Sequence, residues 1–140
     1  MKLLDVNVWL SGVWQGHRRH QVSKAWMEAA EDEIAFCRVT QMAFLRLTTN
    51  PAVTGLDALT RREAWNLLDR ITIDRRVRFL VEPEGLLPLW VAFSKRDDSS
   101  HLLWTGDYLA AFAAAADAEL VTLDRRLTGR YPSVKVICLL

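Results

Sequence analysis

Short apolar segments of two to four residues alternate along this chain with longer segments whose apolar side chains recur at helical spacing. Parallel strands need a crossover helix between them, so this alternation predicts a central, mainly parallel sheet with helices on both faces. We therefore expect a three-layer α/β/α sandwich. The predicted strands are Leu3–Leu4, Ile34–Cys37, Val77–Leu80, Glu119–Thr122 and Val134–Ile137.

The segments between these strands carry helix signals of two kinds. Most show an apolar stripe at spacings of three and four residues. Thr60 also stands three residues before Glu63, which is the form of a capping box, and Thr40 is a candidate cap for the helix that Asn50–Pro51 ends. The predicted helices are Trp9–Val13, His20–Ala30, Thr40 to residue 49, Thr60–Ile71, Glu84–Lys95 and Asp107–Ala118.

Length and composition limit the chain to one ordinary globular domain, residues 1–140. Charged residues make up 25% and the formal net charge is +1, so binding nucleic acid through bulk positive charge is not expected. No apolar run is long enough to span a bilayer, and the first residues do not have the pattern of a signal peptide. Two cysteines, Cys37 and Cys138, fit reduced buried thiols of a cytoplasmic protein.

Three aspartates stand where the predicted strands and helices meet the carboxyl edge of the sheet, which is where open parallel sheets bind ligands. Asp5 follows the first strand, Asp124 follows the fourth, and Asp107 opens a helix. Clustered carboxylates repel one another unless a cation lies between them, and oxygen ligands suit Mg²⁺ or Mn²⁺. Taken singly, Asp107 could be a helix cap and Asp124 a turn residue, whereas Asp5 lies in an apolar context that normally excludes charge.

Three motifs, taken in order, resemble the PIN-domain family, and more narrowly the VapC-type toxins of bacterial toxin–antitoxin pairs. They are Leu4-Asp5-Val6-Asn7-Val8, Thr105-Gly106-Asp107-Tyr108-Leu109-Ala110-Ala111 and Val121-Thr122-Leu123-Asp124. The resemblance covers nearly the whole chain and implies a PIN-like fold. It also implies that Asp5, Asp107 and Asp124 are catalytic metal ligands, with Asn7 and Thr122 as supporting polar groups.

One position departs from the family pattern. The glutamate usual on the helix after the second strand is matched here by Ala43. Thr40 or Gln41 could supply an oxygen or a bridging water in its place. A weaker second metal site would follow from this change, so the number of ions stays open.

The resemblance implies an Mg²⁺- or Mn²⁺-dependent endoribonuclease that hydrolyses structured RNA such as tRNA or rRNA. It further implies a small VapB-type antitoxin that blocks the acidic site, and a homodimer. Four arginines are candidate contacts for the phosphate backbone: Arg46, Arg125, Arg126 and Arg130.

Two other classes remain open. The first is a PIN-like module that binds RNA or a partner without catalysis, which the alanine at position 43 favours. The second is an aspartate phosphoacceptor or phosphatase. It fits less well, because Asn7 stands where such phosphatases carry a second aspartate and Lys135 lies inside a strand. The tryptophans divide in a similar way: Trp26, Trp65 and Trp90 fit a core, whereas Trp9, Trp14 and Trp104 could stack on RNA or contact a partner.

Overall fold

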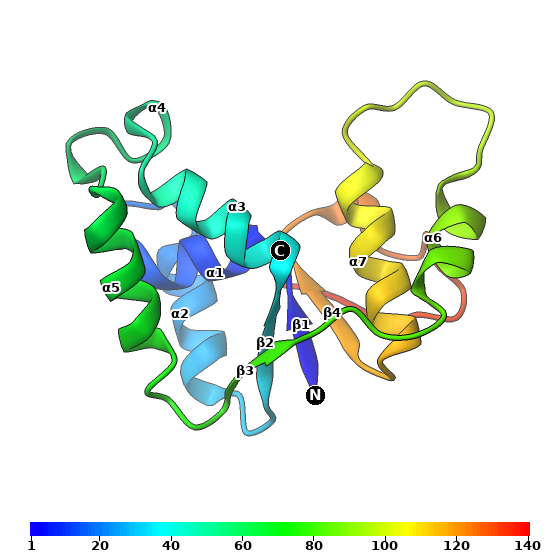
Figure 1. The fold of residues 1–140 in the computed structure, drawn as a ribbon, viewed down its shortest axis with the longest axis horizontal. Coiled ribbons are helices and arrows are strands. Elements are labelled where there is room, and N and C mark those ends of the chain that lie inside the picture. Colours follow the sequence, from blue (N-terminus) through cyan, green and yellow to red (C-terminus); the bar gives the residue numbers. More distant parts are fainter.

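The fold is a five-stranded parallel sheet between two layers of helices, as predicted (Figure 1). The computed structural model describes all 140 residues. The strand order is β3-β2-β1-β4-β5, so the first strand lies in the centre and the two halves of the chain extend to either side of it. The strands are β1 (Lys2–Leu4), β2 (Ile34–Cys37), β3 (Val77–Leu80), β4 (Glu119–Thr122) and β5 (Val136–Cys138).

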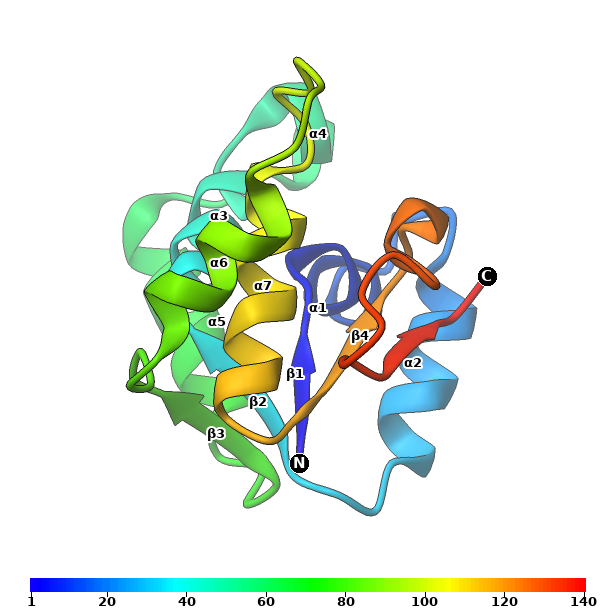
Figure 2. The ribbon, with the colours of Figure 1, turned by 90° about the vertical axis from the view of Figure 1, so that its right-hand side faces the viewer.

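The helices divide between the two faces of the sheet. Figures 1 and 2 show α1, α2, α3 and α5 on one face and α6 and α7 on the other. No helix is both long enough and apolar enough to cross a membrane. The helices are α1 (Val6–Val13), α2 (His20–Ala29), α3 (Arg38–Thr48), α4 (Pro51–Thr54), α5 (Arg61–Ile71), α6 (Leu86–Ser94) and α7 (Trp104–Ala115).

Each face of the sheet has its own apolar core. Successive side chains of a strand point to opposite faces, so Leu3 packs into the cluster under α6 and α7 while Leu4 packs into the cluster under α1 and α3. The second cluster contains Trp9, which is fully buried and stacks on Phe36 with ring centroids 3.8 Å apart. Trp9 is therefore a core residue and not an RNA-stacking or partner-contact surface.

Three helices begin earlier than their sequence signals indicate. Helix α1 starts at Val6 rather than Trp9, directly after Asp5. Helix α3 is capped by Cys37, and Thr40 lies inside its first turn, where the hydroxyl accepts the Cys37 N–H at 3.0 Å. Helix α7 starts at Trp104, so the prediction that Asp107 opens it was wrong by three residues.

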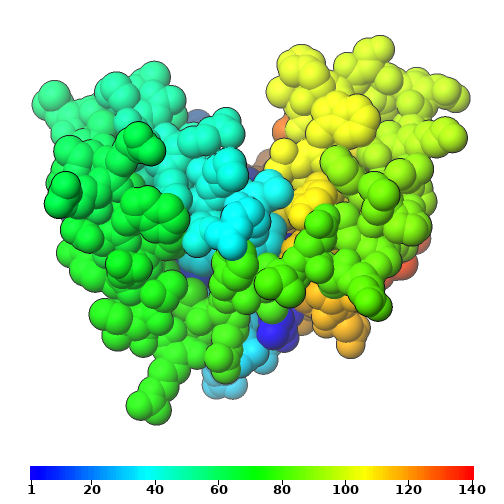
Figure 3. Space-filling view, viewed as in Figure 1, coloured from blue at the N-terminus to red at the C-terminus, as the bar shows by residue number.

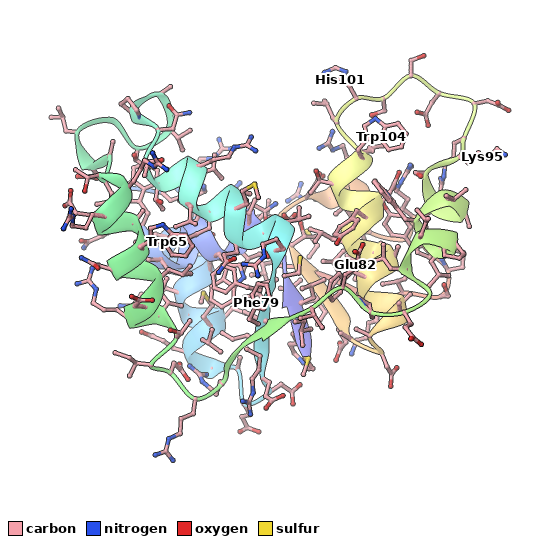
Figure 4. The ribbon with its side chains drawn as sticks, in the orientation of Figure 1. Trp65, Phe79, Glu82, Lys95, His101 and Trp104 are labelled. Carbon is pink, nitrogen blue, oxygen red and sulfur yellow. The ribbon has the colours of Figure 1, made fainter.

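A second correction concerns Trp65, which the helical stripe of α5 places in the predicted core. The side chain is half exposed. Together with Met42 and Leu45 of α3 it lines an open hollow between α3 and α5 (Figure 4). Helical spacing indicates that α5 has an apolar stripe. It does not indicate how much of that stripe the neighbouring elements cover, and Trp65 lies on the part that they leave exposed.

The molecule is notched above the carboxyl ends of the central strands. In Figure 3 the two helical layers part at the top of the view, between α3 and α7. His101 and Trp104 stand on the α7 side of this notch (Figure 4). The residues that follow β1, β2 and β4 therefore reach the floor of an open concavity, the position that open α/β sheets use for ligands.

Candidate functional site

Asp5 lies at the junction of β1 and α1, where its side chain is nearly buried. Its backbone N–H donates to Val121 O at 2.9 Å, which continues the pairing of β1 with β4, and its carbonyl accepts the first bonds of the helix. Only 9% of the residue is exposed. Burial raises the pKa of the Asp5 carboxyl, because removal from water disfavours the charged form. The backbone of β1 and α1 thus holds the Asp5 carboxyl in a buried position, where ionisation costs free energy.

A polar network built from three chain segments surrounds this carboxylate. Thr122 at the end of β4 donates its hydroxyl to Asp5 Oδ2 at 2.8 Å, and Asn7 Nδ2 donates to the same oxygen at 3.0 Å. Asn7 Oδ1 in turn accepts the Leu123 N–H at 3.1 Å. Both side-chain donors bind Oδ2, so Oδ1 takes no hydrogen bond from a side chain. The network orients the carboxylate, and hydrogen bonding from the backbone of Val6 and Asn7 opposes part of the rise in its pKa.

Asp124 joins the same network through the backbone. Its N–H donates to Thr122 Oγ1 at 3.0 Å, and its charge further raises the pKa of Asp5. The Asp124 side chain caps a short 3₁₀ turn, Arg125–Leu127, and makes an ion pair with Arg126 at 2.7 Å. Hydrogen bonding to Arg126 lowers the pKa of the Asp124 carboxyl. Asp5 and Asp124 are therefore neighbours, of which only Asp124 has an arginine to balance its charge.

Asp107 lies in a different network. Its Oδ1 accepts Arg130 Nε at 3.0 Å and also accepts the hydroxyl of Tyr131. Asp107 and Tyr131 are buried and most of the Arg130 side chain is covered. Asp107 also lines a pocket of about 360 Å³ beneath the loop between α6 and α7, together with Lys95, His101 and Trp104.

The structure therefore brings two of the three predicted acids together and holds the third by other partners. No group of three or more His, Cys, Asp or Glu side chains is placed to hold a metal ion. The prediction that Asp5, Asp107 and Asp124 share one ion is not confirmed by this geometry. Arg130 and Tyr131 were missed as partners of Asp107, and no spacing in the sequence links positions 107 and 131.

The two candidate substitutes for the usual glutamate are also engaged elsewhere. The Thr40 hydroxyl donates to Cys37 O at 3.1 Å, inside the first turn of α3. Gln41 accepts a hydrogen bond from Arg38, which lies over the ring of Phe79. Neither side chain hydrogen-bonds to Asp5 or Asp124. These contacts give no support to the prediction that Thr40 or Gln41 replaces the usual glutamate.

The donor set around Asp5 fits a hard divalent cation. The ligand groups present are the carboxylates of Asp5 and Asp124, and Mg²⁺ and Mn²⁺ prefer oxygen ligands of this kind. A buried carboxylate with a second negative charge beside it has an electrostatic need for a cation, which the raised pKa of Asp5 expresses. Asp5 and Asp124 could hold the ion, and Asn7 and Thr122 could orient them.

Comparison with known proteins identifies the family of this chain. The PIN domain family model matches residues 2–131. A Mycobacterium tuberculosis protein named ribonuclease VapC41 is 41% identical over 134 residues, covering 91% of this chain and 92% of the relative. The chain belongs to the PIN-domain family.

Solved structures agree with this PIN-domain fold. VapC20 of Mycobacterium tuberculosis, described as a toxin that cleaves the sarcin–ricin loop, superposes with a TM-score of 0.69 at 13% identity, covering 96% of this chain and 99% of the other. A toxin–antitoxin complex from Klebsiella pneumoniae gives 0.66 at 14% identity, covering 100% of this chain and 98% of the other. At such identities these likenesses show the fold alone, whereas the family model and the VapC41 relative show the family.

Proposed function

We propose that this PIN domain is an endoribonuclease toxin of the VapC type that hydrolyses phosphodiester bonds in structured RNA, such as tRNA or rRNA. The observation that carries the proposal is the Asp5–Thr122–Asp124 network at the carboxyl edge of the sheet. The named ribonuclease relative, aligned over nine-tenths of both chains, supports it. The floor of the notch is the only place where the chain holds a buried acid without a cationic partner beside a second acid.

The roles of the residues follow from their contacts. Asp5 Oδ1 and the carboxylate of Asp124 would hold Mg²⁺ or Mn²⁺, while Thr122 and Asn7 fix Asp5 Oδ2. A cation bound there would polarise the phosphate group and lower the pKa of a bound water molecule. Because Asp5 is held by two side-chain donors and by the backbone of β1, its position is set before substrate arrives, which is the preorganisation that catalysis needs.

Cationic side chains on the α7 side of the molecule could contact the RNA backbone. Arg125 and Arg126 follow β4 and are exposed, and Lys95 and His101 line the pocket beside α7. Arginine binds phosphate in a bidentate manner, and bases displayed in loops are the readable part of folded RNA. These groups support the proposal that the substrate is a structured RNA.

Cleavage of RNA by the purified protein tests the proposal. We expect Mn²⁺-dependent cleavage of total tRNA and rRNA by the natural chain and none by Asp5→Asn, which keeps the shape of the side chain and removes its charge. Asp69→Asn is the matched control, because Asp69 is an exposed helical aspartate on α5. Cleavage by Asp5→Asn at the natural rate would overturn the proposal.

A second candidate function is RNA or partner binding without catalysis. Two observations favour it: Ala43 replaces an acid of the family pattern, and Asp107 is neutralised by Arg130. Under this alternative the protein binds RNA with the same affinity whether Mn²⁺ or EDTA is present, and it releases no new RNA ends.

We further propose that a small antitoxin of the VapB type neutralises this toxin. Toxin–antitoxin complexes among the structural neighbours support a partner of this kind. An arginine or lysine entering the notch would supply the cation that Asp5 otherwise lacks, and a fully paired buried charge is far less costly than an unpaired one. Co-expression with the neighbouring small reading frame is expected to give a complex that does not cleave RNA.

A homodimer and a cytoplasmic location complete the proposal. The exposed apolar side chains Met42, Trp65 and Phe79, from α3, α5 and β3, support contact with a second copy. Both cysteines are free, which suits a reducing compartment. Light scattering of the natural protein and of Trp65→Arg tests the dimer, with the substituted chain expected to be a monomer.

A further inference from the structure

The loop that connects α6 to α7 arches over a pocket of about 360 Å³. Figure 4 shows Trp104 beneath this arch, between His101 on the notch side and Lys95 on the far side. Asp107, the predicted metal ligand of α7, lies in the same wall one helical turn after Trp104. A group bound in this pocket therefore lies next to one of the acids of the predicted metal site.

Trp104 presents an aromatic ring that no other ring covers. It is the first residue of α7 and is 55% exposed. Trp90 meets it at an interplanar angle of 81°, with centroids 6.3 Å apart, and Trp90 Nε1 donates to Trp104 O at 3.3 Å. The buried Trp9, in contrast, has Phe36 stacked on it. Trp90 thus fixes Trp104 from the side and leaves it without a parallel stacking partner.

Two cations of the pocket have no acidic partner. Arg96 donates to the carbonyl oxygens of Phe93 at 2.9 Å and Arg130 at 3.4 Å, and neither Arg96 nor Lys95 makes an ion pair. Asp98, which also lines the pocket, uses Oδ1 to accept a backbone N–H of its own loop. A guanidinium held by carbonyl oxygens keeps its charge, and phosphate matches its geometry.

We propose that this pocket is a nucleotide subsite, in which an unpaired RNA base stacks on Trp104 and the phosphate next to it binds Arg96 and Lys95. The subsite rests on the proposed function, because Asp107 in its wall belongs to the site that would cut the RNA. It adds a selection that the acids alone do not make. Bases inside a duplex are stacked on both faces, so only an unpaired base can reach Trp104.

RNA binding in EDTA, where no metal is available for cleavage, tests the subsite. Fluorescence anisotropy measures the affinity of the purified full-length chain for a short unstructured RNA labelled with fluorescein. We expect Trp104→Ala to weaken binding about 5-fold to 100-fold, the loss of one stacked base, and Trp104→Phe to recover most of it. Leu102→Ala is the matched control, because Leu102 is 62% exposed in the same loop and does not line the pocket.

The dependence of affinity on salt separates the two parts of the subsite. Arg96→Gln should lower the slope of log K against log salt concentration by roughly 0.7, because one phosphate contact is lost. Trp104→Ala should leave that slope unchanged, since stacking a base releases no counterion. A fully paired RNA duplex should bind the natural chain and Trp104→Ala equally.

Three results of the binding assay would overturn the subsite. They are undiminished affinity of Trp104→Ala for the unstructured RNA, an equal loss in Leu102→Ala, and an equal loss for the duplex. Loss of binding to the co-expressed antitoxin by Trp104→Ala, with RNA binding intact, would assign this surface to a protein partner and would also overturn it.

Cleavage in Mn²⁺ distinguishes failure of the subsite from failure of the proposed function. The natural chain is expected to cut next to unpaired nucleotides, and Trp104→Ala to cut the same positions more slowly. Cleavage by Trp104→Ala at the natural rate, with undiminished RNA affinity, overturns the subsite and leaves the nuclease proposal standing. No cleavage by the natural chain overturns the proposed function, and the binding assay still decides whether Trp104 holds a base.

Discussion

At the scale of single residues, the most informative side chain is Asp5, because its burial works against the stability of the fold. The Asp5 carboxyl has a raised pKa, so protonation stabilises the folded state. That stability is present below the ordinary carboxyl pKa of 3.8 and is lost as the pH rises through the raised folded value. Above that raised value the cost of burying the charge remains.

Removing the charge of Asp5 is therefore expected to stabilise the protein when no metal is present. In EDTA at pH 7.5 we expect Asp5→Asn to raise the Tm, by roughly 2–4 °C for each kcal/mol of relieved desolvation. Mn²⁺ should raise the Tm of the natural chain and leave that of Asp5→Asn unchanged, because only the natural chain gains a bound ion. Differential scanning calorimetry measures both, and a lower Tm for Asp5→Asn in EDTA would contradict this account of the carboxylate.

The two tyrosines give a second test at this scale. Burial and then the nearby charge of Glu82 raise the pKa of Tyr108 to about 12, and burial with the hydrogen bond to Asp107 raises the pKa of Tyr131. No other tyrosine is present in the chain. Absorbance at 295 nm should therefore show little tyrosinate in the folded protein at pH 10.5, whereas unfolded chain titrates near pH 10.

Stability should fall with pH in the same range. Because both folded pKa values lie above the unfolded value, unfolding releases protons above pH 10, and the free energy of unfolding decreases as the pH rises further. Ionisation of one tyrosine in the folded protein at its ordinary pKa would show that one ring is solvated, and Tyr131→Phe identifies which ring it is.

At the scale of elements, the helix signals on α5 allow a clean measurement. The Thr60 hydroxyl accepts the Glu63 N–H at 3.1 Å and the Glu63 carboxylate accepts the Thr60 N–H at 3.0 Å, which is the capping box the sequence predicted. We expect Thr60→Ala to lower the free energy of unfolding by about 1 kcal/mol in urea denaturation. Thr72→Ala, at the opposite end of α5, is the control and should cost less, because its hydroxyl only reinforces a helix end.

The elements also show how much of the fold could be predicted from sequence. Strand alternation and apolar runs located all five strands, because parallel strands covered by helices consist mostly of apolar residues, even though the edge strands β3 and β5 are partly exposed. The cap of α3 could not be predicted, since Cys37 performs it through a weak sulfur contact and Thr40 assists from within the helix. Periodicity shows that a helix has an apolar stripe, but the tertiary fold decides whether Trp65 is covered.

The candidate site, like the fold, has a part that the sequence predicts and a part that depends on tertiary contacts. Strand ends could be predicted, so the sequence alone places Asp5 and Asp124 together at one edge. The direction of the Asp107 side chain could not, because it depends on where α7 begins and on partners 23 and 24 residues away. Contacts over that sequence distance are tertiary, and no local pattern records them.

At the scale of the whole molecule, the sheet and its two helical layers serve to hold separate chain segments at one edge. The notch in Figure 3 is formed because α3 and α7 belong to opposite layers that part above the strand ends. Its floor holds an uncompensated acid, and its α7 side carries arginine, lysine and histidine. This distribution of charge suits a polyanion bound across the notch with a cation beneath it.

The most direct test is RNA cleavage by equal amounts of the natural chain, Asp5→Asn and Asp69→Asn, with Mn²⁺ or EDTA, read by sequencing the new 5′ ends. The account predicts discrete cuts in folded RNA by the natural chain and by Asp69→Asn in Mn²⁺, and no cuts by Asp5→Asn or in EDTA. Identical cuts from Asp5→Asn, or cuts that persist in EDTA, would contradict it.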